Sequence, residues 1–142
     1  MDPDALIAAL DLAPHPEGGW YRQTWMAEAA PGTRPAGTAI LFLLKAGTRS
    51  HWHRVDAAEI WLWHAGAPLI LSTSATEEGP AQDTRLGPEV LAGEMPQAVV
   101  PAHHWQAAAT AGAFTLVSCT VSPGFRFEGF TLAPPGFDIP RR

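Results

Sequence analysis

Short apolar runs alternate with turns along most of this chain. The runs are rich in Val, Leu, Ile, Phe, Trp and Thr, and glycine or proline separates one run from the next. Runs of this length and composition predict β-strands. We expect strands at residues 20–27, 38–44, 50–54, 59–64, 69–74, 82–86, 98–100, 105–109, 114–121 and 126–133. Strands at this spacing are typical of a β-sandwich or barrel, so the pattern predicts an all-β fold.

The first residues carry the one helical pattern. Leu6, Ile7 and Leu10 lie on one stripe of a short helix over residues 2–10, which Asp2 caps. Neither a linker nor a repeat divides the remainder of the chain. We therefore expect a single domain over residues 1–142, with the helix and a loop at 1–14, the β-domain at 15–133 and a tail at 134–142.

Two of the predicted strands, at residues 39–44 and 114–121, are apolar on both faces. Strands of this kind are covered on both sides. In a single antiparallel barrel, the cover on the outer face is either a second sheet or a partner subunit. The pattern therefore predicts a homodimer.

Composition excludes two classes of protein. The chain has 142 residues, of which 13 are Gly and 14 are Pro, and this content is incompatible with a helical bundle or coiled coil. Hydrophobic residues make up 46% and charged residues 16%, whereas a disordered chain has low hydrophobicity and high charge. A chain of this length buries a substantial core.

Charge and cysteine content narrow the partners and the compartment. The net charge is −5 and Lys45 is the single lysine, so the basic surface that nucleic-acid binding requires is missing. The longest apolar runs are too short for a bilayer, and the acidic N-terminus lacks the basic region of a secretory signal. Cys119 is the single cysteine, which excludes an internal disulfide. We expect a cytoplasmic protein with no nucleic-acid or membrane partner.

The chain holds six Trp and six His, and half of each set lies between residues 51 and 64. His51 and His53 alternate along a predicted strand, so their side chains should face the same side. Glu59 begins the next strand, and Trp61 and Trp63 should share its face. Two imidazoles and a carboxylate suit either a divalent metal or acid–base catalysis, and two indoles would form the apolar wall of a small-molecule pocket. The alternative is a polar pair on an exposed strand.

The order of these residues, His-x-His followed by Glu59 and then by Gly66, resembles the first motif of the cupin superfamily. Further segments resemble the small-cupin family DUF985, also called cupin 5. They are HPEGGWYR at 15–22, AILFLL at 39–44, HR at 53–54, EIW at 59–61, GAPL at 66–69, GEMPQAVVP at 93–101, Trp105, and CTVSPGFRF at 119–127. The resemblance covers residues 15–133. It implies a double-stranded β-helix, or jelly roll, with a short N-terminal helix, and a homodimer, but no settled activity.

Two departures from the cupin pattern affect the metal site that the resemblance implies. His53 and Glu59 are one residue further apart than in typical metal cupins, and Gln106 stands where the second motif supplies its ligand histidine. Glutamine is a poor ligand for transition metals compared with imidazole. His103, which falls at the position of a glycine, or His104 could substitute. The resemblance leaves open whether the pocket holds a divalent metal (Ni, Zn, Fe or Mn) or none, and the candidate ligands are His51, His53, Glu59 and Gln106.

Four further residues are candidates for the pocket, each with a structural alternative. Tyr21 and Arg22 would hold a substrate anion or transfer protons, or else form a buried phenol and a salt bridge. Gln97 would reach the pocket mouth as a donor and acceptor, or satisfy backbone groups of a turn. Trp105 would form a pocket wall or pack in the core.

Two classes of function fit these residues. The first is an isomerase, epimerase or lyase that acts on a sugar or another small metabolite, with His51 or His53 as general base and Glu59 or Tyr21 as acid or orienting group. The second is a non-catalytic domain that binds a sugar, nucleotide or other metabolite. A structural dimer with a vestigial site is a third possibility, and the sequence leaves the choice open.

Overall fold

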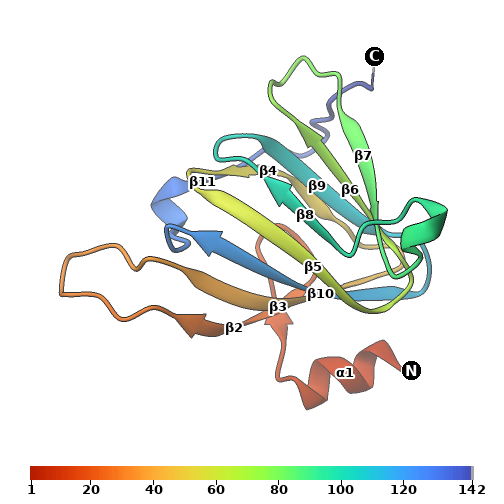
Figure 1. Ribbon diagram of the computed structural model, residues 1–142, viewed down its shortest axis with the longest axis horizontal. Coiled ribbons are helices and arrows are strands. Elements are labelled where there is room, and N and C mark those ends of the chain that lie inside the picture. The colour runs from red at the N-terminus through yellow and green to blue at the C-terminus, as the bar shows by residue number, and fades with distance from the viewer. Residues whose placement is uncertain (142) are drawn as a thin grey trace.

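The structure is a computed structural model that describes residues 1–141, so that residue 142 of the predicted tail lies outside the described residues. Strands dominate it, with one short α-helix near the N-terminus of this part of the chain (Figure 1). The elements are α1 (Pro3–Ala9), β1 (Ala13–Pro14), β2 (Trp20–Met26), β3 (Thr38–Lys45), β4 (Ser50–Val55), β5 (Ala58–Gly66), β6 (Leu69–Ser74), β7 (Gln82–Leu86), η1 (Val90–Ala92), β8 (Gln97–Val100), β9 (Trp105–Thr110), β10 (Phe114–Ser122), η2 (Phe127–Gly129) and β11 (Phe130–Leu132).

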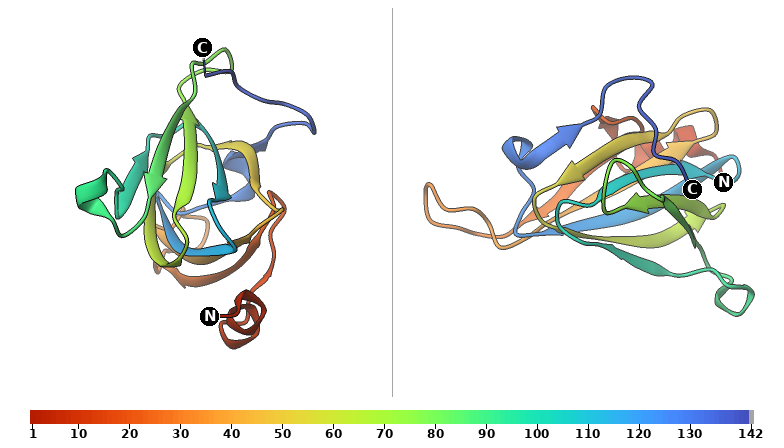
Figure 2. Two further views of the ribbon diagram at one scale, coloured as in Figure 1. Left: turned by 90° about the vertical axis from the view of Figure 1, so that its right-hand side faces the viewer. Right: turned by 90° about the horizontal axis from the view of Figure 1, so that it is seen from above.

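The strands form two antiparallel sheets that face each other, as the two rotated views show (Figure 2). The six-stranded sheet has the order β1-β2-β3-β10-β5-β8, and the five-stranded sheet has the order β11-β4-β9-β6-β7. Neighbours in each sheet come from distant parts of the chain, as in β3 beside β10 and β4 beside β9. This arrangement is the jelly roll, and the predicted fold class is confirmed.

The predicted strands up to residue 121 are present, with ends that differ by at most two residues. The last predicted strand, at 126–133, differs: its first half forms the 3-10 turn η2 and only Phe130–Leu132 is a strand. At Gly129 the backbone passes so close to the Asp56 carboxylate that a Cβ would collide with it. The Asp56 backbone N–H also donates to the Gly129 carbonyl oxygen at 3.0 Å, and pairing with β4 begins at the next residue, Phe130.

The outer face of β3 and β10 is covered by α1. Leu43 and Phe114 are buried there with Leu12, and the helix residues Leu6 and Ile7 pack against them. The helix begins at a cap, in which the Asp2 side chain accepts a hydrogen bond from a backbone N–H of the first turn at 3.0 Å. The helix thus covers part of this apolar face within one chain. The homodimer stays a prediction.

Apolar side chains fill one end of the barrel and leave the other end open. Phe42, Leu44, Trp61, Leu71 and Val117 belong to the cluster that fills the closed end. The open end lies beside β11 and the turn η2, where the pocket described below is found.

The outer face of the five-stranded sheet carries a second apolar cluster. Trp52, Trp105 and Ile139 are buried in it, and the Trp52 indole N–H donates to Oδ1 of Asp138 at 2.8 Å. The tail therefore packs against this sheet, as Figure 1 shows for the segment that runs to the C-terminal end. Among residues 1–141, no helix has the length and apolar character that a membrane crossing needs.

Candidate functional site

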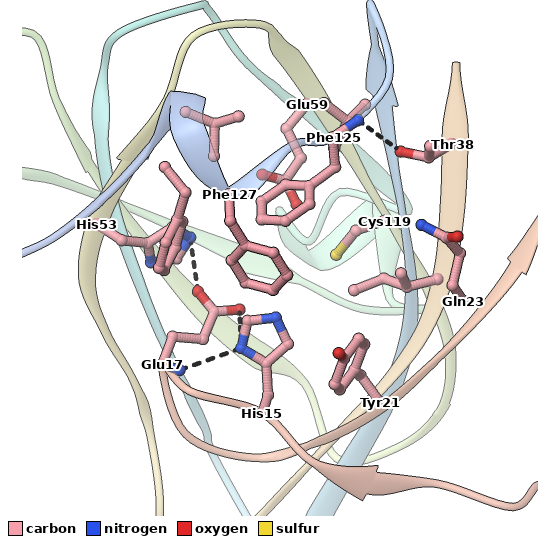
Figure 3. Close-up of a pocket in the computed structure, with 14 residues that line it drawn as sticks. His15, Glu17, Tyr21, Gln23, Thr38, His53, Glu59, Cys119, Phe125 and Phe127 are labelled. Atoms are coloured by element: carbon pink, nitrogen blue, oxygen red, sulfur yellow. Dashed lines mark hydrogen bonds and ion pairs between the residues drawn. The ribbon is translucent and has the colours of Figure 1, made fainter. Parts of the chain in front are cut away.

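The open end of the barrel holds a cavity of about 230 Å³. Its size is below the roughly 300–1,000 Å³ of pockets for drug-sized ligands, so it suits a small molecule. Polar and aromatic side chains from both sheets meet in it (Figure 3). The lining residues are His15, Glu17, Tyr21, Gln23, Thr38, Ile40, His53, Val55, Glu59, Cys119, Val121, Phe125, Phe127 and Phe130.

His53 and Glu17 form a buried ion pair on one wall. Nε2 of His53 lies 2.7 Å from Oε2 of Glu17, and neither side chain is more than 7% exposed. The other ring nitrogen, Nδ1, is 2.8 Å from the backbone oxygen of His51. A carbonyl oxygen can only accept, so Nδ1 carries a hydrogen and the ring is held from both sides.

Glu17 reaches the barrel on a loop that two glycines allow. Gly18 and Gly19 have φ angles of +111° and +80°, a region that other residues avoid. A Cβ on Gly18 would collide with the backbone oxygen of Arg49. The loop is further tied to β4 because the His51 backbone N–H donates to the Glu17 carbonyl oxygen at 2.8 Å.

Burial and charge act against each other on this pair. Burial alone would lower the pKa of His53, but the adjacent Glu17 charge and hydrogen bonding to Glu17 outweigh it and raise that pKa to about 9. Burial alone would raise the pKa of Glu17, and the positive charge of His53 brings it below its usual value instead. The pair is therefore ionised at neutral pH.

His15 lies beside this pair as a neutral donor. Its Nδ1 accepts a hydrogen bond from the Glu17 backbone N–H at 3.1 Å, so its hydrogen is on Nε2. Burial lowers the pKa of His15, although the Glu17 charge opposes that effect. The Tyr21 ring packs edge-on against the His15 ring with centroids 4.4 Å apart, and both side chains face the cavity (Figure 3).

Glu59 lies at the back of the cavity, and Gln106 fixes its orientation. The Trp61 indole N–H donates to the Gln106 side-chain oxygen at 2.8 Å, and the Gln106 amide donates to Oε1 of Glu59 at 2.9 Å. An indole N–H can only donate, so it fixes which end of the amide faces Glu59. Oε1 is thereby an acceptor, and Oε2 is the oxygen that carries the proton in the acid form of Glu59.

This carboxyl has an unusual acidity. Burial raises the pKa of Glu59 to about 7, with the neighbouring charge of Glu17 adding to the effect, while His53 and the Gln106 hydrogen bond oppose it. A carboxyl with this pKa is present in both protonation states at neutral pH. It can therefore give or take a proton in the cavity.

Three phenylalanines form the rim. Phe125 and Phe127 meet edge-on with ring centroids 4.9 Å apart, and Phe130 packs edge-on against both. Edge-to-face contacts of this kind are favourable for aromatic rings. Phe127 is 55% exposed, so part of this apolar surface faces solvent at the cavity entrance.

Asp56 holds the rim segment in place. Its carboxylate accepts two hydrogen bonds from Arg34, at 2.7 and 3.2 Å, and two from Arg126, at 3.0 and 3.3 Å. Arg34 also donates to the Gly124 carbonyl oxygen at 2.8 Å. Hydrogen bonds from Arg34 hold the pKa of Asp56 below its usual value. The network ties the β4–β5 turn to the segment that carries the phenylalanines.

Three of the sequence-predicted site residues, His53, Glu59 and Tyr21, line the cavity, and Gln106 supports it. His51 does not line it. The β4–β9 pairing shifts register between Ser50 and His53, and such an irregularity breaks the strict alternation of faces. Nε2 of His51 instead contacts the Pro134 carbonyl oxygen at 3.0 Å.

The predicted tryptophan wall is absent from the lining. Trp61 faces inward as expected, but it is buried in the core cluster beneath Gln106. Trp63 packs against the same cluster, and its indole N–H donates to the Ala67 carbonyl oxygen at 3.1 Å. Trp105 faces away from the barrel because its neighbour Gln106 faces inward, and it packs with Trp52 under the tail.

The remaining candidates lie elsewhere. Arg22 donates to the Leu10 carbonyl oxygen at 2.7 Å at the end of α1, and Gln97 is exposed on the edge strand β8. Neither His103 nor His104 lines the cavity. His103 has a φ of +70°, which explains why glycine suits this position in the cupin pattern.

Sequence reasoning did not assign Glu17, His15 or the phenylalanine rim to the pocket. The segment at 15–22 contains the signal that could have found Glu17, since a carboxylate followed by two glycines marks a tight loop with a charged residue at its tip. No periodic pattern could place it opposite His53. Phe127 and Phe130 lie in a segment whose pattern predicts a strand, where residues an odd number of positions apart would point to opposite faces, and Phe125 precedes that segment.

The donor set does not fit a metal centre. Within residues 1–141, no three His, Cys, Asp or Glu side chains are arranged to hold a metal ion. His51 lies outside the cavity, the Gln106 oxygen accepts from Trp61, and Nε2 of His53 faces Glu17. Metal binding occurs in the cupin superfamily, but the groups in this cavity are engaged with one another.

Comparison with known proteins identifies the family. The sequence profile of the family described as "Cupin superfamily (DUF985)" matches residues 4–133. A comparison with curated proteins finds no match. The chain is similar to a protein of Shewanella oneidensis of known structure, with 39% identity and a TM-score of 0.87 over 94% of this chain and 85% of that one. A hypothetical protein from Leishmania major has 28% identity and a TM-score of 0.86, over 96% of this chain and 90% of that one.

A more distant likeness concerns the fold alone. A variant of oxalate decarboxylase from Bacillus subtilis has 14% identity and a TM-score of 0.65, over 87% of this chain and 31% of that one. The profile match covers most of the chain. Of the segments that resemble cupin 5, those at 15–22, 39–44, 53–54, 59–61 and 119–127 contribute residues to the cavity lining. The chain therefore belongs to the DUF985 family of the cupin superfamily.

Proposed function

We propose that this protein is an enzyme that transfers protons on a small metabolite bound in the barrel, as an isomerase, epimerase or lyase. The single observation that carries the proposal is Glu59, a buried carboxyl that faces the cavity with a pKa of about 7. General acids and bases work best when their pKa lies near the operating pH.

The other lining groups fit supporting roles. Glu59 takes a proton from a carbon next to a substrate carbonyl and returns it, through the Oε2 atom that Gln106 leaves free. Neutral His15 and the Tyr21 hydroxyl are donors that would stabilise a developing oxyanion. The His53–Glu17 ion pair holds one wall of the cavity in place. It also puts the positive charge of His53 close enough to Glu59 to oppose the rise in the Glu59 pKa.

Proton exchange with solvent tests this proposal and requires no identified substrate. Neutral sugars and small hydroxycarbonyl compounds are incubated with the protein in D₂O, and NMR follows deuterium at the carbon beside the carbonyl. We expect the wild type to catalyse exchange into at least one compound and Glu59→Gln to lose the activity by about a hundredfold or more. Glu78→Gln, which changes an exposed carboxylate in the same way, should exchange at the wild-type rate.

The second candidate is a non-catalytic domain that binds a small metabolite. It is favoured by the contacts of His53, because both ring nitrogens already have partners and neither is free to take a proton from a ligand. In that case ligands stabilise the wild type, yet no compound exchanges deuterium faster than in buffer. Exchange that is equal in wild type and Glu59→Gln would also overturn the catalytic proposal.

A further inference from the structure

The cavity has no free positive charge to offer a ligand. Its charged groups are the His53–Glu17 pair, in which one cation faces one anion at 2.7 Å, and Glu59, which is neutral or negative. None of the lining residues within the described part of the chain is Arg or Lys. The lining therefore carries a net charge of zero or below, wherever the proton shared by His53 and Glu17 resides.

The arginines nearest to the rim are already engaged. Arg34 and Arg126 both donate to the Asp56 carboxylate, and neither guanidinium lines the cavity. Recognition of carboxylates and phosphates uses such guanidinium groups or lysines, because desolvation of an anion needs compensating charge. An anionic ligand in this cavity would meet Glu17 and Glu59 in a site that excludes much of the solvent.

Neutral polar groups and apolar rings both line the cavity. Gln23 and Thr38 lie opposite the His53–Glu17 wall, with Phe127 seen between the two sides (Figure 3). The rim adds the phenyl rings of Phe125 and Phe130, together with apolar residues of three strands. Phenyl faces attract apolar and planar groups, whereas hydroxyl and amide groups pair with neutral oxygens and nitrogens.

We propose that this cavity selects neutral small molecules that have one planar or apolar face and one hydroxyl, carbonyl or amide group, and that it rejects carboxylates and phosphates. The inference rests on the proposed function in one respect only, namely that this cavity is the substrate site. Glu17 both offsets the charge of His53 and keeps that ring protonated, so the pair adds no net charge to the lining.

Benzamide and benzoate provide the test, because they share a phenyl ring and a planar head group and differ in charge. We expect the wild type to bind benzamide at millimolar concentration, followed by isothermal titration calorimetry or ligand-observed NMR, and to bind benzoate at least about tenfold more weakly.

A variant with an added positive charge in the lining completes the test. Gln23 lines the cavity but is exposed, so Gln23→Lys adds a positive charge there without disturbing the buried pair. It should increase benzoate affinity about tenfold, with a much smaller effect on benzamide. Gln97→Lys makes the same change in net charge on the exposed edge strand β8, away from the cavity, and should bind benzoate as weakly as the wild type.

Three results would overturn the inference: benzoate binding by the wild type as tight as benzamide binding, no binding of benzamide, or equal gains in Gln23→Lys and Gln97→Lys. These measurements are independent of turnover. Selective benzamide binding without deuterium exchange on any compound would remove the proposed catalysis and leave the selectivity intact. Glu59-dependent deuterium exchange together with tight benzoate binding would support the proposed catalysis and overturn the proposed selectivity.

Discussion

The Gln106 side-chain amide donates to Glu59 at 2.9 Å while its oxygen accepts from the Trp61 indole at 2.8 Å. Gln106 and Trp61 are each 1% exposed, so water cannot replace the amide as partner of the Trp61 N–H. A buried donor or acceptor left without a partner destabilises a protein by about 1–3 kcal/mol. The three side chains thus form one unit in which the glutamine both stabilises the interior and orients the carboxyl.

Gln106→Leu should therefore lower the free energy of unfolding by about 2–4 kcal/mol, because it leaves the buried Trp61 N–H without a partner and removes a hydrogen bond from Glu59. The loss of its hydrogen bond should also raise the pKa of Glu59 further, which ¹³C NMR of the carboxyl can follow. Gln97→Leu changes the same amide on the surface and should alter stability by less than about 0.5 kcal/mol in urea denaturation. Equal effects of the two substitutions would contradict this reasoning.

The raised pKa of Glu59 has a consequence for stability against pH. The unfolded carboxyl ionises near pH 4.5, whereas the folded one keeps its proton until about pH 7. The folded state thus binds more protons in this window, and the free energy of unfolding should fall as pH rises from 4.5 to 7, by on the order of 3 kcal/mol. Chemical denaturation at a series of pH values measures the slope.

Glu59→Gln should remove that slope, since the amide does not titrate. His53 acts in the same direction at higher pH, because the stability contributed by its raised pKa is present below 6.5 and lost as pH rises through about 9. Glu17 acts oppositely, because its lowered pKa contributes stability that is lost in acid. An unchanged slope between pH 4.5 and 7 in Glu59→Gln would assign the effect to another group.

Asp56→Ala should loosen the aromatic rim, because it removes four hydrogen bonds from Arg34 and Arg126. We expect amide hydrogen exchange over residues 125–130 to become about tenfold faster and benzamide binding to weaken. Asp83→Ala breaks a similar contact to Arg141 on the far side of the five-stranded sheet. It should leave exchange at the rim as in the wild type, and an equal change in both variants would speak against a local role for Asp56.

Ile139→Ala should lower the free energy of unfolding by about 2–4 kcal/mol, because it opens a cavity under the tail. Ile139 is fully buried against the cluster of Trp52 and Trp105, although it lies only a few residues from the end of the chain. Val99→Ala removes methyl groups from a residue that is 58% exposed and should be nearly neutral. Thermal and urea unfolding of the two variants compare them directly, and a neutral Ile139→Ala would mean that the tail is not packed in solution.

Divalent metals should leave the protein unchanged, because the candidate ligands do not converge within residues 1–141. We expect protein purified without chelator to contain far less than one metal per subunit, and added Mn, Fe, Ni or Zn to leave the melting temperature unaltered. Elemental analysis and thermal unfolding check both statements. One metal per subunit, lost in His53→Ala but kept in His64→Ala, would overturn them.

Much of the fold follows from local pattern. Apolar runs of strand length, separated by glycine and proline, predict nearly every strand, because each run must bury one face or both. The same alternation correctly places Glu59 and Trp61 on the inner face of β5 and His53 on that of β4. Burial of both faces of β3 was also evident from sequence, but the covering element was not, since α1 lies far from β10 in the chain.

The cavity itself depended on contacts that no local pattern encodes. The sequence alone determined the all-β fold class and, through its resemblance to the cupin family, the jelly roll, and it named His53, Glu59 and Tyr21, which line the cavity. Only the tertiary structure decided that Glu17 faces His53, that a register shift in β4 removes His51 from the cavity, and that phenylalanines of the segment before β11 take the place expected for tryptophans. The physical reason is that strand periodicity fixes which face a side chain occupies, whereas the path of a loop and the filling of a barrel depend on every element that packs there.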